Sequence, residues 1–144
     1  MNTEYKPMLK DWAICLYKDM SDEENEAIME VVADFYQKTR MDSVQIPGPC
    51  VLSGAVYGRD GFNDGDVINT SNIESIERVE RHNKAGTPHD IMCATTKSGS
   101  KYYFYTDECN ADMMLVLGDM IHTGRLDHVL YVTTIKYMGS AYVF

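Results

Sequence analysis

The segment "DIMCATTKSGSKYYFYT", residues 90–106, decides the fold of this chain. It holds two short runs rich in β-branched and aromatic residues, on either side of Ser98-Gly99, a dipeptide suited to a tight hairpin turn. We therefore expect two antiparallel strands. On the second strand, Tyr103 and Tyr105 should share one face, with Tyr102 and Phe104 on the other, because side chains alternate along a strand.

The chain before this hairpin is predicted to begin with a helical arm, residues 1–46. Its first helix is indicated by apolar residues that recur at helical spacing, namely Leu9, Trp12, Ala13 and Leu16. A second helix is expected in "SDEENEAIMEVVADFYQKTR", residues 21–40, because Ser21 and Glu24 match a capping box. "IPGPC", residues 46–50, should end the arm, since proline does not continue a helix.

Residues 47–144 are predicted to form a β-rich body. Strands are expected at "CVLSGAVYG" (50–58), "DVINTSNIESIERVE" (66–80), "DHVLYVTTIKYM" (127–138) and "AYVF" (141–144). A polar loop is expected at "RHNKAGTPH" (81–89), and a further helix within "NADMMLVLGDMIHTG" (110–124). This order of elements predicts one compact α+β domain in which a mainly antiparallel sheet follows the helical arm.

The composition limits the class of protein. With 144 residues and 44% hydrophobic content, the chain is long enough to bury a core of its own. No stretch approaches the ~20 apolar residues of a membrane-spanning helix, the N-terminus does not match a signal peptide, and four scattered cysteines indicate reduced thiols. These features predict a cytoplasmic protein. The net charge of −9 argues against direct nucleic-acid binding and is compatible with a basic protein partner.

No motif for a metal, a cofactor or catalysis is apparent. The loop "YGRDGFNDGD", residues 57–66, departs from a calcium-binding loop, because Phe62 falls where an acid or amide is needed and Ser71 falls where the glutamate ligand is needed. The histidines and cysteines lack the paired spacing of structural zinc sites. No phosphate-binding glycine loop or local nucleophile signature is present. We therefore predict no cofactor and no enzymatic activity, although a catalytic group assembled only in the fold stays open.

Residue types suited to nucleotide binding gather around this loop and around the turns near it. Arginine pairs with phosphate, aromatic rings stack on bases, and hydroxyl or amide groups bond to ribose. In this scheme Arg59 would pair with phosphate, and Phe62 or Tyr103 would stack on a base. The complete set of candidate ligand-binding residues is Tyr57, Arg59, Phe62, Asn63, Thr70, Ser71, Asn72, Ser98 and Tyr103.

The segment 54–102 also resembles a family, the phage anti-Thoeris and anti-CBASS sponge proteins. The resemblance rests on four short elements: Gly54 at a strand entry, Phe62 before Asp64-Gly65, Thr70-Ser71 before Ile73, and Ser98-Gly99-Ser100 before an aromatic strand. It covers about a third of the chain. It implies a homo-oligomer that sequesters cyclic ADP-ribose isomers or cyclic oligonucleotides, without cleaving them, in pockets between subunits.

Three functional hypotheses follow. The first is a phage counter-defence protein that binds a cyclic nucleotide signal, with no chemistry required of it. The second is an acidic inhibitor, like an anti-CRISPR nucleic-acid mimic, that binds a host defence protein directly. The third is a hydrolase of the same signals. Ligand returned intact after capture would favour the first hypothesis over the third, and salt-dependent binding to a basic partner would favour the second.

Overall fold

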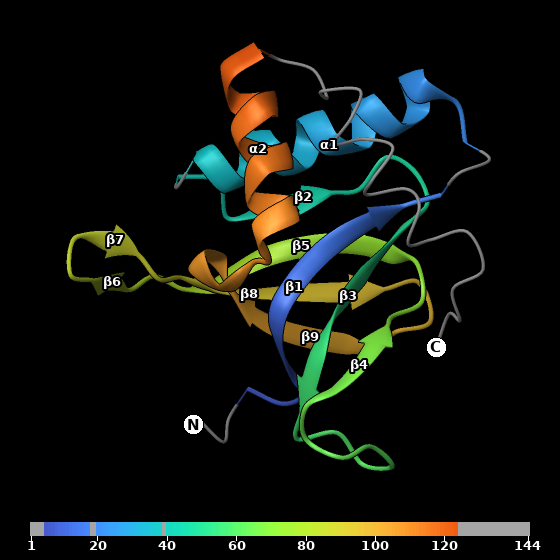
Figure 1. The fold of residues 1–144 in the computed structure, drawn as a ribbon, viewed down its shortest axis with the longest axis vertical. Helices are drawn as coiled ribbons and strands as arrows, with labels where there is room; N and C mark the ends of the chain where they lie inside the picture. The colour runs from blue at the N-terminus through green and yellow to red at the C-terminus, as the bar shows by residue number, and fades with distance from the viewer. Residues whose placement is uncertain (1–4, 18–19, 39, 124–144) are drawn as a thin grey trace.

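The computed structural model describes residues 5–17, 20–38 and 40–123 (Figure 1). Within these residues the predicted α+β class is confirmed, since two α-helices accompany a mainly antiparallel seven-stranded sheet. The strands are β1 (Met8–Leu16), β2 (Ser43–Gln45), β3 (Cys50–Tyr57), β4 (Asp66–Asn69), β5 (Ile73–Glu80), β6 (Asn83–Lys84), β7 (Thr87–Pro88), β8 (Ile91–Thr96) and β9 (Lys101–Tyr105). The helices are α1 (Asp22–Gln37), the short 3₁₀ helix η1 (Thr106–Glu108) and α2 (Ala111–Thr123).

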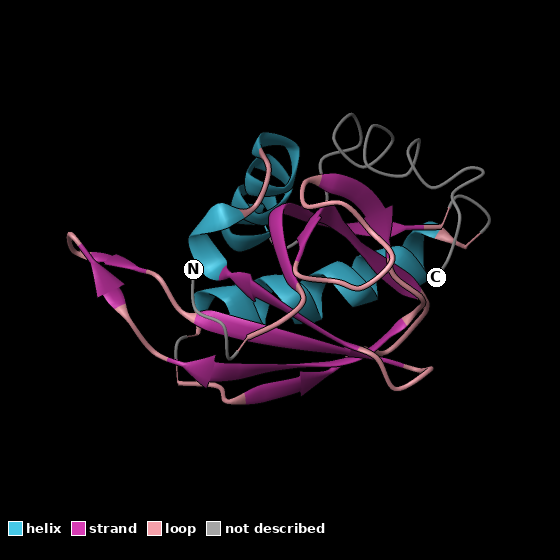
Figure 2. Cartoon of the chain, turned by 90° about the horizontal axis from the view of Figure 1, so that it is seen from below, coloured by secondary structure: helices cyan, strands magenta, loops and turns pink. Residues whose placement is uncertain are grey.

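The sheet has the strand order β2-β5-β8-β9-β1-β3-β4. Its pairs are antiparallel except for β1 and β9, which run parallel through the pair Met8 and Tyr103. Figure 1 shows the sheet curling around the core, with α1 and α2 together on one side of it. The separate hairpin of β6 and β7 projects from the body, as Figure 2 shows.

The prediction of a helix over residues 9–16 is wrong, because these residues form strand β1 in the interior of the sheet. β1 is buried on both faces over most of its length, so apolar residues do not alternate with polar ones. A β-bulge between Lys10 and Ala13 also shifts the register by which β1 pairs with β3. Because of the bulge, Leu9 and Trp12 are both buried although they are three residues apart, and this is the spacing expected of a helix.

Two other predictions need correction. Residues 66–80 form two strands, because Thr70 turns into the protein and its buried hydroxyl accepts a hydrogen bond from the Leu52 amide at 3.0 Å. The predicted polar loop at 81–89 is the β6–β7 hairpin, whose turn residues Ala85 and Gly86 both have positive φ, as in type I′ turns. The strands predicted at 127–138 and 141–144 lie outside the described residues.

The hairpin predicted within residues 90–106 is confirmed as β8 and β9. Gly99 adopts φ +93° and its amide donates to the Thr96 carbonyl at 2.9 Å. Tyr102 and Phe104 are buried, whereas Tyr103 and Tyr105 lie on the other face. The helices predicted from the capping box and from residues 110–124 also form, and the Glu24 amide donates to the Ser21 hydroxyl at 3.2 Å.

A single hydrophobic cluster joins both parts of the chain. It includes Ile28 and Phe35 from α1 together with Leu52 from β3 and Phe104 from β9, so residues on either side of position 46 share one core. Trp12 belongs to this cluster, where its indole packs on Phe104 at 4.8 Å between ring centroids and its Nε1 donates to the Tyr105 carbonyl at 2.7 Å. The N-terminal residues are therefore part of the body of the protein.

A buried ion pair fixes the base of the β6–β7 hairpin. Arg78 Nε on β5 donates to Asp90 Oδ2 at 2.9 Å, and the two side chains are 0% and 5% exposed. The same guanidinium donates to the carbonyls of Met41 and Phe35. Asp90 Oδ1 accepts a hydrogen bond from the His82 amide at the start of the hairpin. This pair therefore connects β5, the chain before β2, α1 and the hairpin.

Candidate functional site

The predicted site residues of the β3–β4 turn face the end of the core. The Arg59 guanidinium lies 4.7 Å from the Phe62 ring centroid and 5.4 Å from that of Tyr102. Its Nη1 is buried, and none of the described residues offers it a hydrogen-bond acceptor. Burial raises the pKa of Tyr102, and the neighbouring Arg59 cation opposes this rise. Arg59 thus closes one end of the core by packing between two rings.

The rest of this turn is held by its own side chains. Gly58, Gly61 and Gly65 have φ of +78°, +87° and +95°, a backbone region that glycine adopts without steric cost. The Gly58 amide donates to Asp64 Oδ1, and the Asn63 amide donates to Asp66 Oδ2, both at 2.9 Å. Asp64 and Asp66 therefore stabilise this turn by accepting backbone hydrogen bonds.

A second group of predicted residues joins the β4–β5 turn to the β8–β9 turn. The Ser71 and Ser98 hydroxyls lie 2.8 Å apart, and the Tyr17 hydroxyl donates to Asn72 Oδ1 at 2.7 Å. Thr70 is fully buried. This group and the Arg59 group lie at opposite ends of β4, whose four residues span about 13 Å. The structure does not bring the two groups together into one site.

The remaining two predicted residues lie on the outer face of the sheet. Tyr57 on β3 and Tyr103 on β9 both pair with Met8, from opposite sides of β1. The Lys10 Nζ lies 5.4 Å from the Tyr57 ring centroid, and the Tyr5 ring packs 5.2 Å from Tyr103. These side chains form a row of aromatic and cationic groups across three strands.

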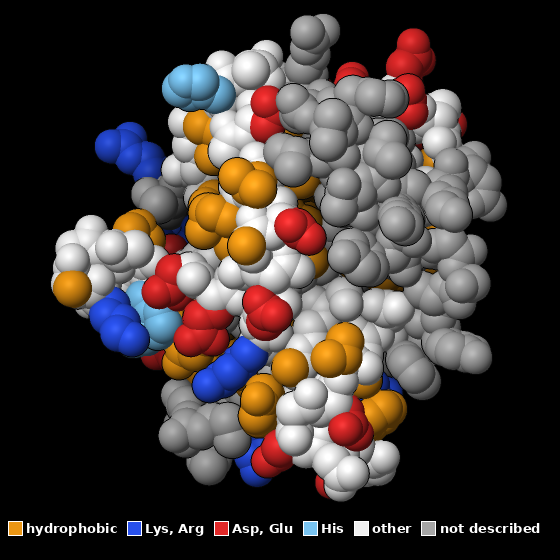
Figure 3. All heavy atoms as spheres, in the orientation of Figure 1, with side chains coloured by type: hydrophobic (Ala, Val, Ile, Leu, Met, Phe, Trp, Pro, Cys, Tyr) orange, Lys and Arg blue, Asp and Glu red, His pale blue; other side chains and the backbone are white. Residues whose placement is uncertain are grey.

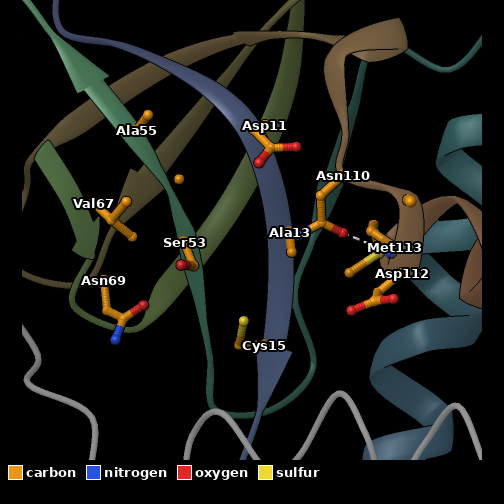
Figure 4. A pocket seen from close by; sticks show the side chains of 12 residues that line it. Asp11, Ala13, Cys15, Ser53, Ala55, Val67, Asn69, Asn110, Asp112 and Met113 are labelled. Atoms are coloured by element: carbon orange, nitrogen blue, oxygen red, sulfur yellow. Dashed lines mark hydrogen bonds between the residues drawn. The ribbon is translucent and has the colours of Figure 1, made fainter. Parts of the chain in front are cut away.

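A cavity of about 610 Å³ opens on the same outer face, next to this row (Figure 4). Its floor is made of small side chains on β1 and β3, and its rim carries polar groups from β4 and the start of α2. Lys10 pairs directly with Ala55 of this floor, so the row and the cavity adjoin. The lining residues are Asp11, Ala13, Cys15, Ser53, Gly54, Ala55, Val67, Asn69, Asn110, Ala111, Asp112 and Met113.

None of the residues that line this cavity was predicted from the sequence as a ligand-binding residue. The available signal was the run of small residues at alternate positions, Ser53 and Ala55 on one strand and Ala13 and Cys15 on its neighbour. That signal becomes visible only if residues 8–16 are recognised as a strand. Asn110 was also overlooked, although its Oδ1 caps α2 by accepting a hydrogen bond from the Met113 amide at 2.8 Å (Figure 4).

The chemistry of the cavity suits hydrogen bonding. Burial raises the pKa of the Cys15 thiol to about 11, so this group is a neutral thiol at physiological pH and a poor nucleophile. Asp11 and Asp112 offer carboxylate acceptors, while Asn69 and Asn110 carry side-chain amides. Among the described residues that line the cavity, none is a lysine or an arginine.

The fold also brings one histidine and one acid together. His89 Nδ1 lies 2.6 Å from Asp107 Oδ1, and the His89 ring stacks on Tyr105 at 4.0 Å between centroids. Neither His89 nor Asp107 lines the cavity. Within residues 5–17, 20–38 and 40–123, no group of three or more potential metal ligands is found, and no helix is long and apolar enough to cross a membrane.

Comparisons with known proteins add no relationship. No protein-family model matches the chain, and no curated protein or solved structure matches it.

Proposed function

We propose that this protein binds and sequesters a cyclic nucleotide immune signal in the host cytoplasm without cleaving it. The ligand would lie on the outer face of β1, β3 and β4. The observation that carries the proposal is the cavity of about 610 Å³ beside the Lys10–Tyr57 pair. A volume of this order is typical of sites for small molecules and cofactors.

The small side chains of the floor are the first support for this ligand class. Ala13, Ser53 and Ala55 leave the backbone of β1 and β3 accessible to a flat ring. The face of the Tyr57 aromatic ring continues this surface beyond Ala55, since both residues point outward from β3. A base placed here would contact apolar surface below it, and amide groups of Asn69 and Asn110 would bond its edges.

Charge would orient the ligand. Lys10 supplies a cation at one end of the site, where it would pair with a phosphate group. Asp11 and Asp112 stand in the cavity itself, and they would repel phosphate but accept hydrogen bonds from hydroxyl or amino groups. Arg59 takes no part in this arrangement, because its guanidinium packs on Phe62 and Tyr102.

The family resemblance supports the same conclusion, because its segment 54–102 includes the part of β3 that forms the cavity floor. It also suggests a homo-oligomer. Val67 on the edge strand β4 is 77% exposed at the cavity rim, where a second copy of the chain would cover it. Sequestration of this kind needs only tight binding of the ground state.

Filling the cavity should abolish capture. We expect Ala55→Trp to lower the apparent affinity at least about 100-fold, since the indole and the ligand would compete for the same space. Val79→Trp is the matched control, because Val79 on β5 is an exposed strand residue outside the cavity. The affinity of Val79→Trp for the ligand should stay close to that of the original protein. The melting temperatures of both variants should also stay close to that of the original protein.

The measurement is capture followed by release. The protein is incubated with cyclic ADP-ribose isomers and cyclic di- and trinucleotides, filtered and then heated, and both fractions are chromatographed. A ligand that disappears from the filtrate and returns intact establishes sequestration. A converted product would instead indicate a hydrolase, for which His89 and Asp107 are the residues to replace. Passage of the whole panel would refute the proposal.

A second candidate function is inhibition of a basic host defence protein. Met114, Leu115 and Ile121 on α2 are 44%, 56% and 39% exposed. Figure 3 shows hydrophobic and acidic side chains next to one another on the face that carries α2. Such a surface suits a basic amphipathic helix.

This candidate is tested with a synthetic helical peptide of leucine and lysine. The peptide should bind at about 0.05 M salt and lose most of its affinity at about 0.5 M, since screening weakens surface charge interactions. Leu115→Glu should reduce binding by removing apolar contact, whereas Ala55→Trp should leave it unchanged. If peptide binding changes neither with salt concentration nor with Leu115→Glu, the exposed surface of α2 is not the binding site.

A further inference from the structure

We infer that the outer face of β3, β1 and β9 binds single-stranded nucleic acid. This partner goes beyond the proposed function, because it is a polymer and it uses a surface outside the cavity. The surface consists of a tyrosine row, formed by Tyr57, Tyr103 and Tyr105, with exposed lysines on both sides of it. Unpaired bases would stack on the rings, and the lysines would pair with backbone phosphates.

The pairing of the strands places the tyrosines on one face. Tyr57 and Tyr103 both pair with Met8, from opposite sides of β1, so they lie two strand spacings or about 10 Å apart. Tyr105 lies two residues along β9 from Tyr103, which is about 7 Å on the same face. The Tyr5 ring packs against Tyr103, with 5.2 Å between the ring centroids. Aromatic rings spread over a sheet in this way can stack several bases of one strand.

The tyrosine row faces away from the hydrophobic core. Tyr102 and Phe104 alternate with the row along β9, and both belong to the core cluster, which also contains the buried residues of α1 and α2. Among the described elements, the two helices therefore bury their apolar residues against the opposite face of β9 (Figure 1). Tyr57, Tyr103 and Tyr105 are partly exposed, so a ligand can reach them from solvent.

Lys101 and Lys10 lie on opposite sides of the tyrosine row. β1 and β9 run parallel, and Met8 of β1 pairs with Tyr103 of β9. Lys101 precedes Tyr103 by two residues. Lys10 follows Met8 by two residues, so each lysine lies about 7 Å from the row along its strand. Lys6 lies before Met8, on the side of Lys101. The three lysines are exposed, and none makes a salt bridge with a described residue.

The charge of this face differs from that of the whole chain. Residues 5–10, 50–57 and 101–105 contain three lysines and no acidic residue, although the net charge of the chain is −9. α1 alone carries six acidic residues and no basic one, and it lies on the other side of the sheet. A helix is about 10 Å wide, and the Debye length is about 8 Å at physiological salt. The exposed acids of α1 are therefore largely screened from these lysines.

The shape of the face favours a single strand over a duplex. Bases stack on aromatic side chains only when they are unpaired, and this face has no helix or hairpin that would enter a duplex groove. Glu77 on β5 lies beyond Cys93, which separates it from Tyr103, and Asp11 follows Lys10. These two acids limit the basic area to the width of three strands, about 10 Å, which suits one phosphate backbone.

Fluorescence anisotropy with a labelled oligothymidylate of about 12 nucleotides tests the inference. The original protein should bind it at about 0.05 M salt, and log affinity should fall with log salt with a slope near −2, because each phosphate contact of a single strand contributes about −0.7. Lys101→Gln should make this slope shallower by about 0.7. Lys38→Gln, an equal charge change on the side of the sheet that carries α1, should leave the slope unchanged.

Tyr103→Ala tests stacking separately from charge. It should lower the affinity about 10- to 100-fold without changing the salt slope, whereas Tyr103→Phe should retain the affinity because it keeps the ring. Neither Lys101 nor Tyr103 is among the described residues that line the cavity, so these variants should capture cyclic nucleotides as the original protein does. Lys101 is exposed, so Lys101→Gln remains a test even if Tyr103→Ala fails to fold.

Two results would overturn the inference. The first is that the single strand does not bind at about 0.05 M salt; binding of phosphatidylserine vesicles in its place would assign the lysines to a membrane surface. The second is equal affinity for a duplex of the same length, unchanged by Tyr103→Ala, since charge alone would then explain the binding. Neither result bears on sequestration in the cavity.

Discussion

Replacing Asp90 by alanine is expected to lower the free energy of unfolding by about 3–5 kcal/mol, the typical cost of removing one partner from a buried ion pair. The Arg78 side chain is fully buried, so its charge would remain in the core without a counterion. The two backbone carbonyls of Met41 and Phe35 would still accept its protons, but they carry no net charge. The amide of His82 would also lose its acceptor.

Urea denaturation followed by circular dichroism measures this change. Asp42→Ala is the matched control, because it breaks the Arg81–Asp42 pair, whose side chains are 50% and 79% exposed. Exposed pairs contribute at most about 1 kcal/mol. Replacing Arg78 and Asp90 together with leucine should recover much of the loss, since no buried charge then remains. Equal effects of Asp90→Ala and Asp42→Ala would show that Arg78 has access to water.

Two glycine-to-alanine substitutions are expected to change stability in opposite directions. A Cβ at Gly54 would lie 2.9 Å from the Lys10 carbonyl oxygen and 3.3 Å from the Trp12 Cα. Both are backbone atoms of the bulge in β1, so neither moves without disturbing the sheet. We expect Gly54→Ala to cost about 1–3 kcal/mol through overpacking.

Gly118 is the matched position. It lies in α2, and no described atom lies within 4 Å of a Cβ built there. Gly118→Ala should stabilise the protein by about 0.5–1 kcal/mol, because alanine favours the helix. Thermal and urea unfolding of the two variants measure both changes in the free energy of unfolding, a decrease for Gly54→Ala and an increase for Gly118→Ala. A neutral Gly54→Ala would mean that the bulge relaxes around the added methyl group.

The elements that could be predicted from sequence are those with local signals. Ser21 and Glu24 mark the start of α1, and Ser98-Gly99 marks the β8–β9 turn, each through contacts between near neighbours in the chain. β1 has no such signal. Its apolar residues pack on both faces of the sheet, and the bulge at Asp11 changes their spacing. Only partners distant in the sequence make these residues a strand.

In the candidate site, too, residues with a local sequence signal could be predicted, and residues brought together only by the fold could not. Residues near the turns were recognised by type, and Tyr57 does lie beside the cavity, whereas Arg59 and Thr70 are used by the fold itself. The cavity floor combines β1 with β3, and Asn110 joins it from beyond residue 105. Because small residues such as Ala13 and Ser53 have no chemical signature of their own, their position in the sheet alone assigns them to a site.

The parallel pairing of β1 with β9 has a consequence for how the chain folds during synthesis. Met8 meets its partner Tyr103 only after almost the whole described chain has been made. At 5–20 residues per second, this interval lasts about 5–20 s. In that time β1 has its neighbour β3 available for pairing, and β3 has β4, since both strands are complete by residue 69. The strands that form the cavity floor, β1 and β3, are therefore expected to pair early, and β9 is expected to join β1 later.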